Sequence, residues 1–308
     1  MSKIATAIQL LKNHPGEFKA SLVKLIAPLL SDKTYLSKMF YYRMGYKIKW
    51  DAPATFSEKL QWLKLYDRNP YYTTLVDKHE VKSRVAQLIG ESHVARTLGV
   101  WDSPNEIDFN SLPNQFVLKT TNGGGNCGVI ICKDKTKLNS AKVKESLRHS
   151  LKQDLYRDSR EWPYKNIRKR IIAEEYLEDV QTGELRDYKF FCFDGKVKAM
   201  FVATERQKRE EPFFNFFDEN FNPLDIKQGH PRAEQWPEKP VKFVEMVSIA
   251  ERLSTGLPHV RIDLYQVNGR VYFGEYTFYH FGGMVPFEPE SWDKTFGGWL
   301  TLPKNNKE

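Results

Sequence analysis

Three polar side chains interrupt an apolar stretch near the end of the chain, residues 259–278, which reads HVRIDLYQVNGRVYFGEYTF. Valine, isoleucine, tyrosine and phenylalanine dominate it, as in two half-buried strands, and Asn-Gly at 268–269 is a strong signal for a hairpin turn. Arg261, Asp263 and Glu275 are out of place there, because a carboxylate on a sheet face is costly unless it is paired or bound to a cation. Aspartate and glutamate on adjacent strands supply only oxygen, which suits Mg²⁺.

The length of the turn decides whether the two carboxylates share a face. Because side chains alternate along a strand, a loop of the Asn-Gly pair alone would place Asp263 opposite Gly274 and turn Glu275 to the other face. A three-residue loop with a bulge would make Glu275 a diagonal neighbour of Asp263, roughly 7–8 Å away. A metal site therefore requires the odd-length loop. The alternative is that the two acids form salt bridges with Arg261 and Arg270.

Length and composition indicate a soluble globular protein with two or three lobes: 308 residues, 41% hydrophobic and 28% charged. The formal net charge of +8 favours acidic partners such as nucleotide phosphates, an anionic polymer or a lipid surface, and the lack of an arginine-rich tail argues against nucleic acid. Cys127, Cys132 and Cys192 are odd in number and lack metal-binding spacing, which indicates a reducing cytosol. No apolar run reaches the roughly 20 residues of a membrane span, and the N-terminus has no cleavable signal pattern.

The first 34 residues carry two short amphipathic segments, residues 4–11 and 18–30, in which lysines alternate with isoleucine, leucine and valine. One interpretation is a pair of helices packed on the body of the protein. The other is an interfacial helix that brings the protein to anionic lipid at the inner face of the membrane. The second interpretation predicts peripheral membrane association through residues 1–34.

A predicted helix after residue 76 presents a lysine at its start. Asp77 and Glu80 fit a capping box and Gly90 fits a helix end, so we predict a helix that begins at Asp77. Lys78 then occupies the first helical position, where its charge opposes the helix dipole and helix stability does not select it. This lysine either faces a phosphate or is simply solvated.

A glycine-rich segment, TTNGGGNCG, joins two predicted strands, residues 116–121 and 129–132. Gly123, Gly125 and Gly128 match G-x-G-x-x-G, but a dinucleotide-binding fold needs a helix after the glycines, and here a strand follows. The segment is therefore a hairpin tip. Its backbone N–H groups either lie over phosphates or belong to an ordinary flexible hairpin.

Two further predicted strands carry charged residues. Residues 170–177, RIIAEEYL, place Glu174 and Glu175 near a strand end. The backbone there either reads an adenine edge, with Glu175 at a ribose hydroxyl, or the two glutamates are solvated. Residues 187–193, DYKFFCF, predict a strand that turns at residues 194–195, Asp-Gly, into the next strand.

The motifs described above occur in the order and spacing of the ATP-grasp superfamily, which the chain therefore resembles. They are a lysine at a helix start, V-L-K before a glycine-rich hairpin, E-E-Y-L, D-Y-K on an aromatic strand, and R-I-D followed by G-E-Y-T. Residues 50–300 are similar to its TupA-like branch, which is associated with teichuronopeptide and other cell-surface polysaccharide synthesis. The resemblance implies an α+β ATP-grasp fold, two antiparallel α+β lobes clasping ATP, with an N-terminal helical extension. The segments implied are an extension (1–55), an N-terminal lobe (56–113), a central lobe with the glycine-rich loop (114–178), and a C-terminal lobe with the metal-binding hairpin and a closing tail (179–308).

The resemblance also implies roles for individual residues. ATP would contact Lys78 and Lys119 at its phosphates, Gly123, Gly124 and Gly125 in the loop, Glu174, Tyr176 and Leu177 at the adenine, Glu175 at the ribose, and Asp187. Mg²⁺ would bind Asp263, Glu275 and Thr277; the family has an asparagine at the last position, and a hydroxyl is a poorer ligand. The catalytic residues implied are Arg261, Lys189 and Arg206, with Asn215 matching an asparagine that follows.

The implied activity is that of an ATP-dependent carboxylate–amine ligase, in which the γ-phosphoryl group passes to a carboxylate and an amine then displaces phosphate from the acyl phosphate. The substrates implied are an amino acid and a uronic acid of a cell-surface polysaccharide or its precursor, in the cytoplasm. Arg206, Lys208 and Arg209 are candidates to hold the acidic substrate. The alternative is a glycan-binding or glycosyl-transfer protein on the same scaffold. Retention of the phosphate-binding lysines and the two acids favours the ligase, and Thr277 favours the alternative.

Overall fold

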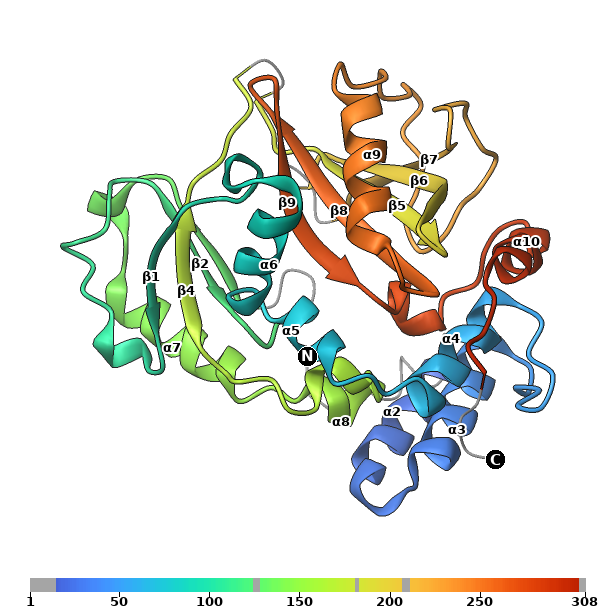
Figure 1. The fold of residues 1–308 in the computed structure, drawn as a ribbon. Helices are drawn as coiled ribbons and strands as arrows, with labels where there is room; N and C mark the ends of the chain where they lie inside the picture. The colour runs from blue at the N-terminus through green and yellow to red at the C-terminus, as the bar shows by residue number, and fades with distance from the viewer. Residues whose placement is uncertain (1–14, 124–127, 181–182, 207–210, 305–308) are drawn as a thin grey trace.

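The computed structural model describes residues 15–123, 128–180, 183–206 and 211–304, which form two antiparallel sheets with helices packed on them (Figure 1). The helices are α2 (Pro15–Leu25), α3 (Asp32–Met44), α4 (Phe56–Tyr66), α5 (Tyr71–Val76), α6 (Glu80–Ile89), α7 (Ser140–Leu151), α8 (Leu155–Ser159), α9 (Phe243–Ser254) and α10 (Ser291–Trp299). The strands are β1 (Thr97–Trp101), β2 (Phe116–Thr120), β3 (Val129–Cys132), β4 (Ile171–Glu175), β5 (Asp187–Phe193), β6 (Lys196–Thr204), β7 (Phe213–Asp218), β8 (His259–Val267) and β9 (Arg270–Thr277).

The first sheet has the strand order β1-β4-β2-β3. Helix α7 covers it, packing Val143 and Leu147 against Phe116. The glycine-rich segment joins β2 to β3 as predicted. Gly128, where this hairpin closes, has a φ of +72°, and a Cβ atom there would lie 2.2 Å from Thr120 Oγ1, so only glycine fits.

The second sheet has the order β7-β6-β5-β8-β9, and α9 packs on its three central strands. Both predicted hairpins are confirmed. Asp194 and Gly195 between β5 and β6, and Asn268 and Gly269 between β8 and β9, all have positive φ, as a two-residue type I′ turn requires.

The prediction that the last hairpin needs an odd-length loop is wrong. Val267 pairs with Arg270, so the loop holds only two residues. The register shifts within β9 instead, where Gly274 is an extra residue, and beyond it Asp263 pairs directly with Glu275. A Cβ atom on Gly274 would lie 2.9 Å from the Asp263 carbonyl oxygen, so a side chain does not fit at this bulge.

The helix predicted to begin at Asp77 begins instead at Glu80, with Asp77 and Lys78 in the turn that precedes it. Asp77 does cap this helix, since its Oδ1 accepts hydrogen bonds from the backbone N–H groups of His79 (2.8 Å) and Glu80 (3.1 Å). The Glu80 side chain does not complete a capping box, because it pairs with Arg170 at 2.7 Å.

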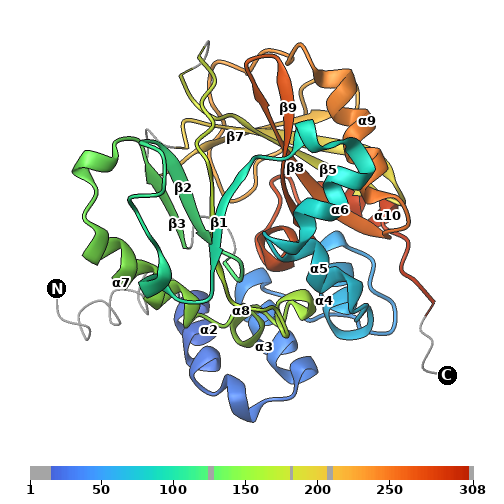
Figure 2. The ribbon, with the colours of Figure 1, turned by 60° about the vertical axis from the view of Figure 1, so that its left-hand side comes forward.

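Helices α5 and α6 lie between the two sheets, and α2 and α3 form a separate helical hairpin below them (Figures 1 and 2). The α2–α3 hairpin has its own small core, which includes Ala20, Val23, Leu36 and Phe40. The first predicted amphipathic segment, residues 4–11, lies outside the described ranges. Within the described residues, no helix is long and apolar enough to cross a membrane.

We predict that Gly274→Ala lowers the free energy of unfolding by about 1–3 kcal/mol, because the new Cβ collides with the backbone of β8. Urea denaturation measures this. Gly298→Ala is the matched control: that glycine lies in α10, and a Cβ atom added there would meet nothing within 4 Å, so alanine should be neutral or stabilise by up to about 1 kcal/mol. Equal effects of the two substitutions would contradict the bulge.

Candidate functional site

Strands β5, β8 and β9 bring charged side chains into one row. Lys189 pairs with Asp263 across β5 and β8, and Asp263 pairs with Glu275 across β8 and β9. Arg261 lies two residues before Asp263, on the same face, and pairs with Thr277. One sheet face therefore gathers a lysine, an arginine, two carboxylates and a hydroxyl.

Asp263 is fully buried and held by two cations. Arg261 donates from Nε to Oδ1 (2.7 Å) and from a terminal nitrogen to Oδ2 (2.8 Å), and Lys189 Nζ also donates to Oδ2. Burial alone raises the pKa of Asp263, but the charges of Arg261 and Lys189 outweigh it and hold the pKa below its ordinary value. The carboxylate is therefore ionised at neutral pH.

A buried histidine fixes the orientation of Arg261. His280 Nδ1 accepts a hydrogen bond from Arg261 (2.5 Å), and its Nε2–H donates to Gln228 Oε1 (3.1 Å), whose amide nitrogen donates to the Val285 carbonyl (2.9 Å). Burial lowers the pKa of His280 well below its ordinary value, and Arg261 and Lys189 lower it further. The imidazole is therefore neutral, as an acceptor at Nδ1 must be.

The salt-bridge interpretation of the hairpin is right for one arginine and wrong for the other. Arg261 pairs with Asp263 and lies 3.7 Å from Glu275. Arg270 instead donates to the Ser92 carbonyl (3.1 Å) and stacks on Tyr272. Arg261 and Lys189 together occupy three of the four lone pairs of Asp263, which leaves one on Oδ1, and Glu275 keeps more.

The donor set suits Mg²⁺ accompanied by a phosphate. Asp263 and Glu275 stand directly opposite each other, and Thr277 contributes a hydroxyl that already bonds Arg261 (3.0 Å) and Glu275 (3.5 Å). Across the described ranges, no group of three or more His, Cys, Asp or Glu side chains gathers to hold a metal. Two carboxylates completed by phosphate oxygens and water are a common magnesium shell, so the residues fit an ion that arrives with a nucleotide.

Asp187 on β5 and Arg206, just after β6, extend the row. Lys189 Nζ lies 2.6 Å and an Arg206 terminal nitrogen 2.7 Å from Asp187 Oδ2. Asp187 Oδ1 is buried and accepts no hydrogen bond from the described part of the chain, so it is available to a ligand donor. Asn215, matched to the family by sequence, instead holds both backbone groups of Ala233.

Helix α6 and the first sheet contribute a second cluster, built on α6, β2 and β4. Glu174 is buried and pairs at 2.5 Å with both Lys82 and Lys119. Lys78 Nζ donates to the carbonyl oxygen of Gly123 at the start of the glycine-rich segment. Glu174 is therefore not a solvated glutamate: it holds two lysines at the base of the hairpin.

The two clusters face each other. Burial lowers the pKa of Lys78, while the charge of Glu275 raises it, and Lys119 and Glu174 also act on this lysine. Glu275 belongs to the second sheet and the other two residues to the first, so Lys78 lies within electrostatic range of both. Lys78 of the first cluster and Glu275 of the second, both predicted from sequence, are thus within electrostatic range of each other.

The end of β4 is only partly as expected. Glu175 accepts a hydrogen bond from the backbone N–H of Arg96 (2.8 Å), which occupies one of its carboxylate oxygens. Within the described residues, no backbone hydrogen bond occupies the main chain of Tyr176 or Leu177, which leaves these groups open to an adenine edge. Four of the predicted or suggested residues lie outside the described ranges: Gly124, Gly125, Lys208 and Arg209.

Several members of this region were not predicted from the sequence. Lys82 has its role through Glu174, 92 positions along the chain, so no local pattern marks it. Lys64 is buried, donates to the Gly282 carbonyl (2.7 Å), and has its pKa lowered to about 8 by burial, which the nearby Glu161 opposes. No local pattern in the sequence marks Lys64, because only the tertiary fold brings α4 to residues 280–283.

One family model matches most of the sequence. The model of the TupA-like ATPgrasp family matches residues 58–301. The chain belongs to this family. The α+β ATP-grasp fold expected from the motifs is therefore confirmed, with its two antiparallel sheets. Among curated proteins, none matches this chain.

Solved structures of ATP-grasp ligases are similar in fold to this TupA-like chain. The D-alanine–D-alanine ligase of Bacillus anthracis is 18% identical over 67% of this chain and 57% of its own, with a TM-score of 0.38. That of Helicobacter pylori is 15% identical over 81% and 70%, with a TM-score of 0.42. The ATP-grasp ligase PsnB, complexed with its minimal precursor, Mg and ADP, is 12% identical over 72% and 57%, with a TM-score of 0.40. The chain thus aligns with little more than half the length of the first and third.

We predict that Glu174→Gln destabilises the protein by about 2–3 kcal/mol at pH 7, measured by urea denaturation. Burial raises the pKa of Glu174, but Lys119 and Lys82 outweigh it and lower the pKa to about 2, from an ordinary 4.5. The contribution is therefore complete above about pH 4.5 and is lost as the pH falls toward 2, so wild type and variant should converge in acid. Glu178→Gln, which removes an exposed ion pair with Lys133, is the matched control and should change stability far less, because solvent screens that pair. A loss that does not depend on pH would contradict this role.

Proposed function

We propose that this protein is an ATP-dependent carboxylate–amine ligase that joins an amino acid to a uronic acid of a cell-surface polysaccharide or its precursor. The observation that carries the proposal is the direct pairing of Asp263 with Glu275 on a sheet face, within electrostatic range of Lys78. Membership of the TupA-like ATP-grasp family supports it. The activity, the substrates and the place in polysaccharide synthesis belong to the proposal.

The charge balance of the region favours a polyanion. Cationic side chains outnumber carboxylates in the two clusters, with six against five: Lys78, Lys82, Lys119, Lys189, Arg206 and Arg261 with Asp77, Glu174, Asp187, Asp263 and Glu275. A bare divalent cation meets this excess of positive charge unfavourably, whereas the triphosphate of ATP offsets it. The nucleotide and Mg²⁺ are therefore expected to bind together.

In this proposal, Lys78 and Lys119 hold the phosphates, and the open backbone of Tyr176 and Leu177 meets the adenine. Asp263 and Glu275 hold Mg²⁺, which supplies charge neutralisation at the phosphate oxygens when bound. Arg261, fixed by His280, stabilises negative charge on the transferred phosphoryl group.

The proposed ligase reaction has two steps, phosphoryl transfer to the carboxylate and then attack by the amine. An oxygen of the substrate carboxylate forms a bond to the γ-phosphorus as the bond to the leaving ADP breaks. The amine then forms a bond to the acyl carbon, phosphate leaves with the C–O bond electrons, and the amine loses a proton. The protein positions the reactants and stabilises charge in both steps, with Arg206 and Lys189 placed to meet an acidic substrate beside the buried Asp187 Oδ1.

Glu161 supplies a carboxylate that suits the incoming amine. Burial raises the pKa of Glu161, and Lys64 only partly opposes this effect. Burial raises the pKa of the nearby Tyr164 well above its ordinary value, and the charges of Glu161 and Glu275 act in the same direction. An incoming amine beside Glu161 would meet a carboxylate whose raised pKa favours uptake of the proton that the amine loses.

The test measures ADP release with a panel of uronic acids, each supplied with amino acids or with hydroxylamine as a surrogate amine. We expect ADP release that depends on one of the uronic acids, and hydroxamate with hydroxylamine. Glu275→Gln should lower this release roughly 100-fold or more, because a metal ligand at the phosphates is lost.

Glu219→Gln, at an exposed site on the turn after β7, is the control and should keep wild-type turnover. ADP release that is unchanged by Glu275→Gln would contradict the assignment of the metal site. Binding of an ATP analogue without ADP release from any carboxylate would favour instead the glycan-binding alternative, which the hydroxyl of Thr277 in place of a family asparagine already suggests.

A further inference from the structure

We infer that the α2–α3 hairpin docks the protein on an anionic phospholipid bilayer. Four large aliphatic residues are exposed along α2 and the following 3-10 helix η1 (Ala27–Leu29), and we call them the α2 stripe: Leu22, Leu25, Ile26 and Leu29. Leu22 and Leu25 lie three residues apart on α2, and Ile26 and Leu29 continue the exposed row past the end of that helix. This inference does not depend on the ligase chemistry.

The α2 stripe is not the side of the helix that packs on the protein. Ala20, Val23 and Ala27 are buried on the opposite side, in the small core shared with α3. Leu25 is 74% and Leu29 is 84% exposed. The other large exposed apolar residues of the described part of the chain are spread over several elements. The α2 stripe is therefore where exposed aliphatic side chains cluster, and such a cluster indicates an apolar binding partner.

Net positive charge is concentrated in the first 50 residues of the sequence, which include this hairpin. Residues 1–50 contain nine lysine and arginine residues and two acidic ones, a net charge of +7 out of +8 for the whole chain. The ATP-grasp region that follows is therefore almost neutral overall. An anionic bilayer offers both hydrocarbon for the stripe and negative charge for the lysines, whereas an acidic glycan or a nucleic acid offers only the charge.

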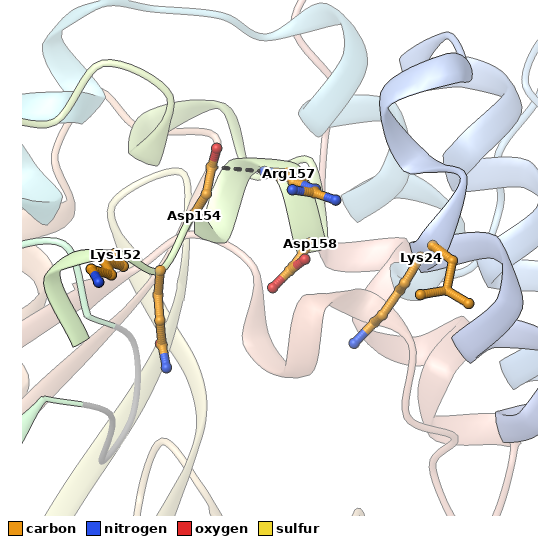
Figure 3. A pocket seen from close by; sticks show the side chains of 7 residues that line it. Lys24, Lys152, Asp154, Arg157 and Asp158 are labelled. Carbon is orange, nitrogen blue, oxygen red and sulfur yellow. Dashed lines mark hydrogen bonds between the residues drawn. The ribbon is translucent and has the colours of Figure 1, made fainter. Parts of the chain in front are cut away.

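A depression beside the stripe adds room for a lipid headgroup. It has a volume of about 370 Å³ and lies between the end of α2 and the segment from α7 to α8 (Figure 3). Its lining includes the stripe residue Leu25 and the cations Lys24, Lys152 and Arg157. Two acids, Asp154 and Asp158, also line it, but Asp154 already caps α8 by accepting the Arg157 backbone N–H at 3.0 Å.

The experiment is flotation of the full chain with vesicles of phosphatidylcholine alone or with about 30% phosphatidylglycerol. We expect binding to the anionic vesicles that weakens as salt is raised, and little binding to the neutral ones. The double variant Leu25→Asp, Leu29→Asp should lower the bound fraction at least tenfold. The matched control Val241→Asp, Val244→Asp changes two residues that are 91% and 78% exposed beside and in α9, and should bind as wild type does.

Both double variants change exposed residues, so their thermal unfolding should match that of wild type. Wild type that stays unbound to anionic vesicles at low salt would overturn the inference, as would equal binding by the two double variants. Light scattering adds one further outcome. A wild-type dimer that the Leu25→Asp, Leu29→Asp variant converts to a monomer, without vesicle binding, would assign the stripe to a contact between copies of the chain and overturn the lipid assignment.

Discussion

The structure depends on keeping an ionised carboxylate inside a sheet. Asp263 is fully buried in the strand between β5 and β9, and an unpaired charge there would cost several kcal/mol. Arg261 and Lys189, on the same sheet face, offset that cost by pairing with the carboxylate. His280 in turn fixes the orientation of Arg261. The charged row exists only because three neighbouring strands hold these side chains in register.

A single extra glycine completes the row. Without the bulge at Gly274, the two-residue turn would place Glu275 on the opposite face, and Asp263 would have no acidic neighbour across the hairpin. The bulge also needs the absence of a side chain, since Gly274 lies against the backbone and ring of β8 residues. The same physical rule operates in the first sheet, where Gly128 lets the hairpin close against Thr120.

Much of the fold could be predicted from local sequence patterns. Asn-Gly and Asp-Gly marked both turns of the second sheet correctly, and alternation and β-propensity located the strands, because these signals are local. The sequence predicted that Asp263 and Glu275 would share a face only with a three-residue loop, whereas a bulge at Gly274 brings them together. A bulge glycine cannot be distinguished from any other strand glycine until the pairing with the partner strand is known. Lys82, His280 and Lys64 were missed because their roles arise from residues about 20 to over 200 positions away, which no periodicity reports.

The site residues form two half-sites, one on each sheet, with positive charge in excess between them. In that arrangement each half holds its own carboxylates with its own cations, Glu174 with two lysines and Asp263 with Lys189 and Arg261. A nucleotide triphosphate would replace part of this internal pairing with contacts from both lobes at once. The other proposed contacts of the nucleotide depend on the ion that we propose to bind between Asp263 and Glu275.

The most direct measurement is a crystal structure of the protein with an ATP analogue and Mn²⁺ in place of Mg²⁺, with anomalous scattering used to locate the metal. We expect a Mn²⁺ peak about 2.1–2.3 Å from carboxylate oxygens of both Asp263 and Glu275, and bonded to phosphate oxygens that contact Lys78 and Lys119. A nucleotide bound with its metal away from these two carboxylates, or with its phosphates away from the two lysines, would contradict the proposed site.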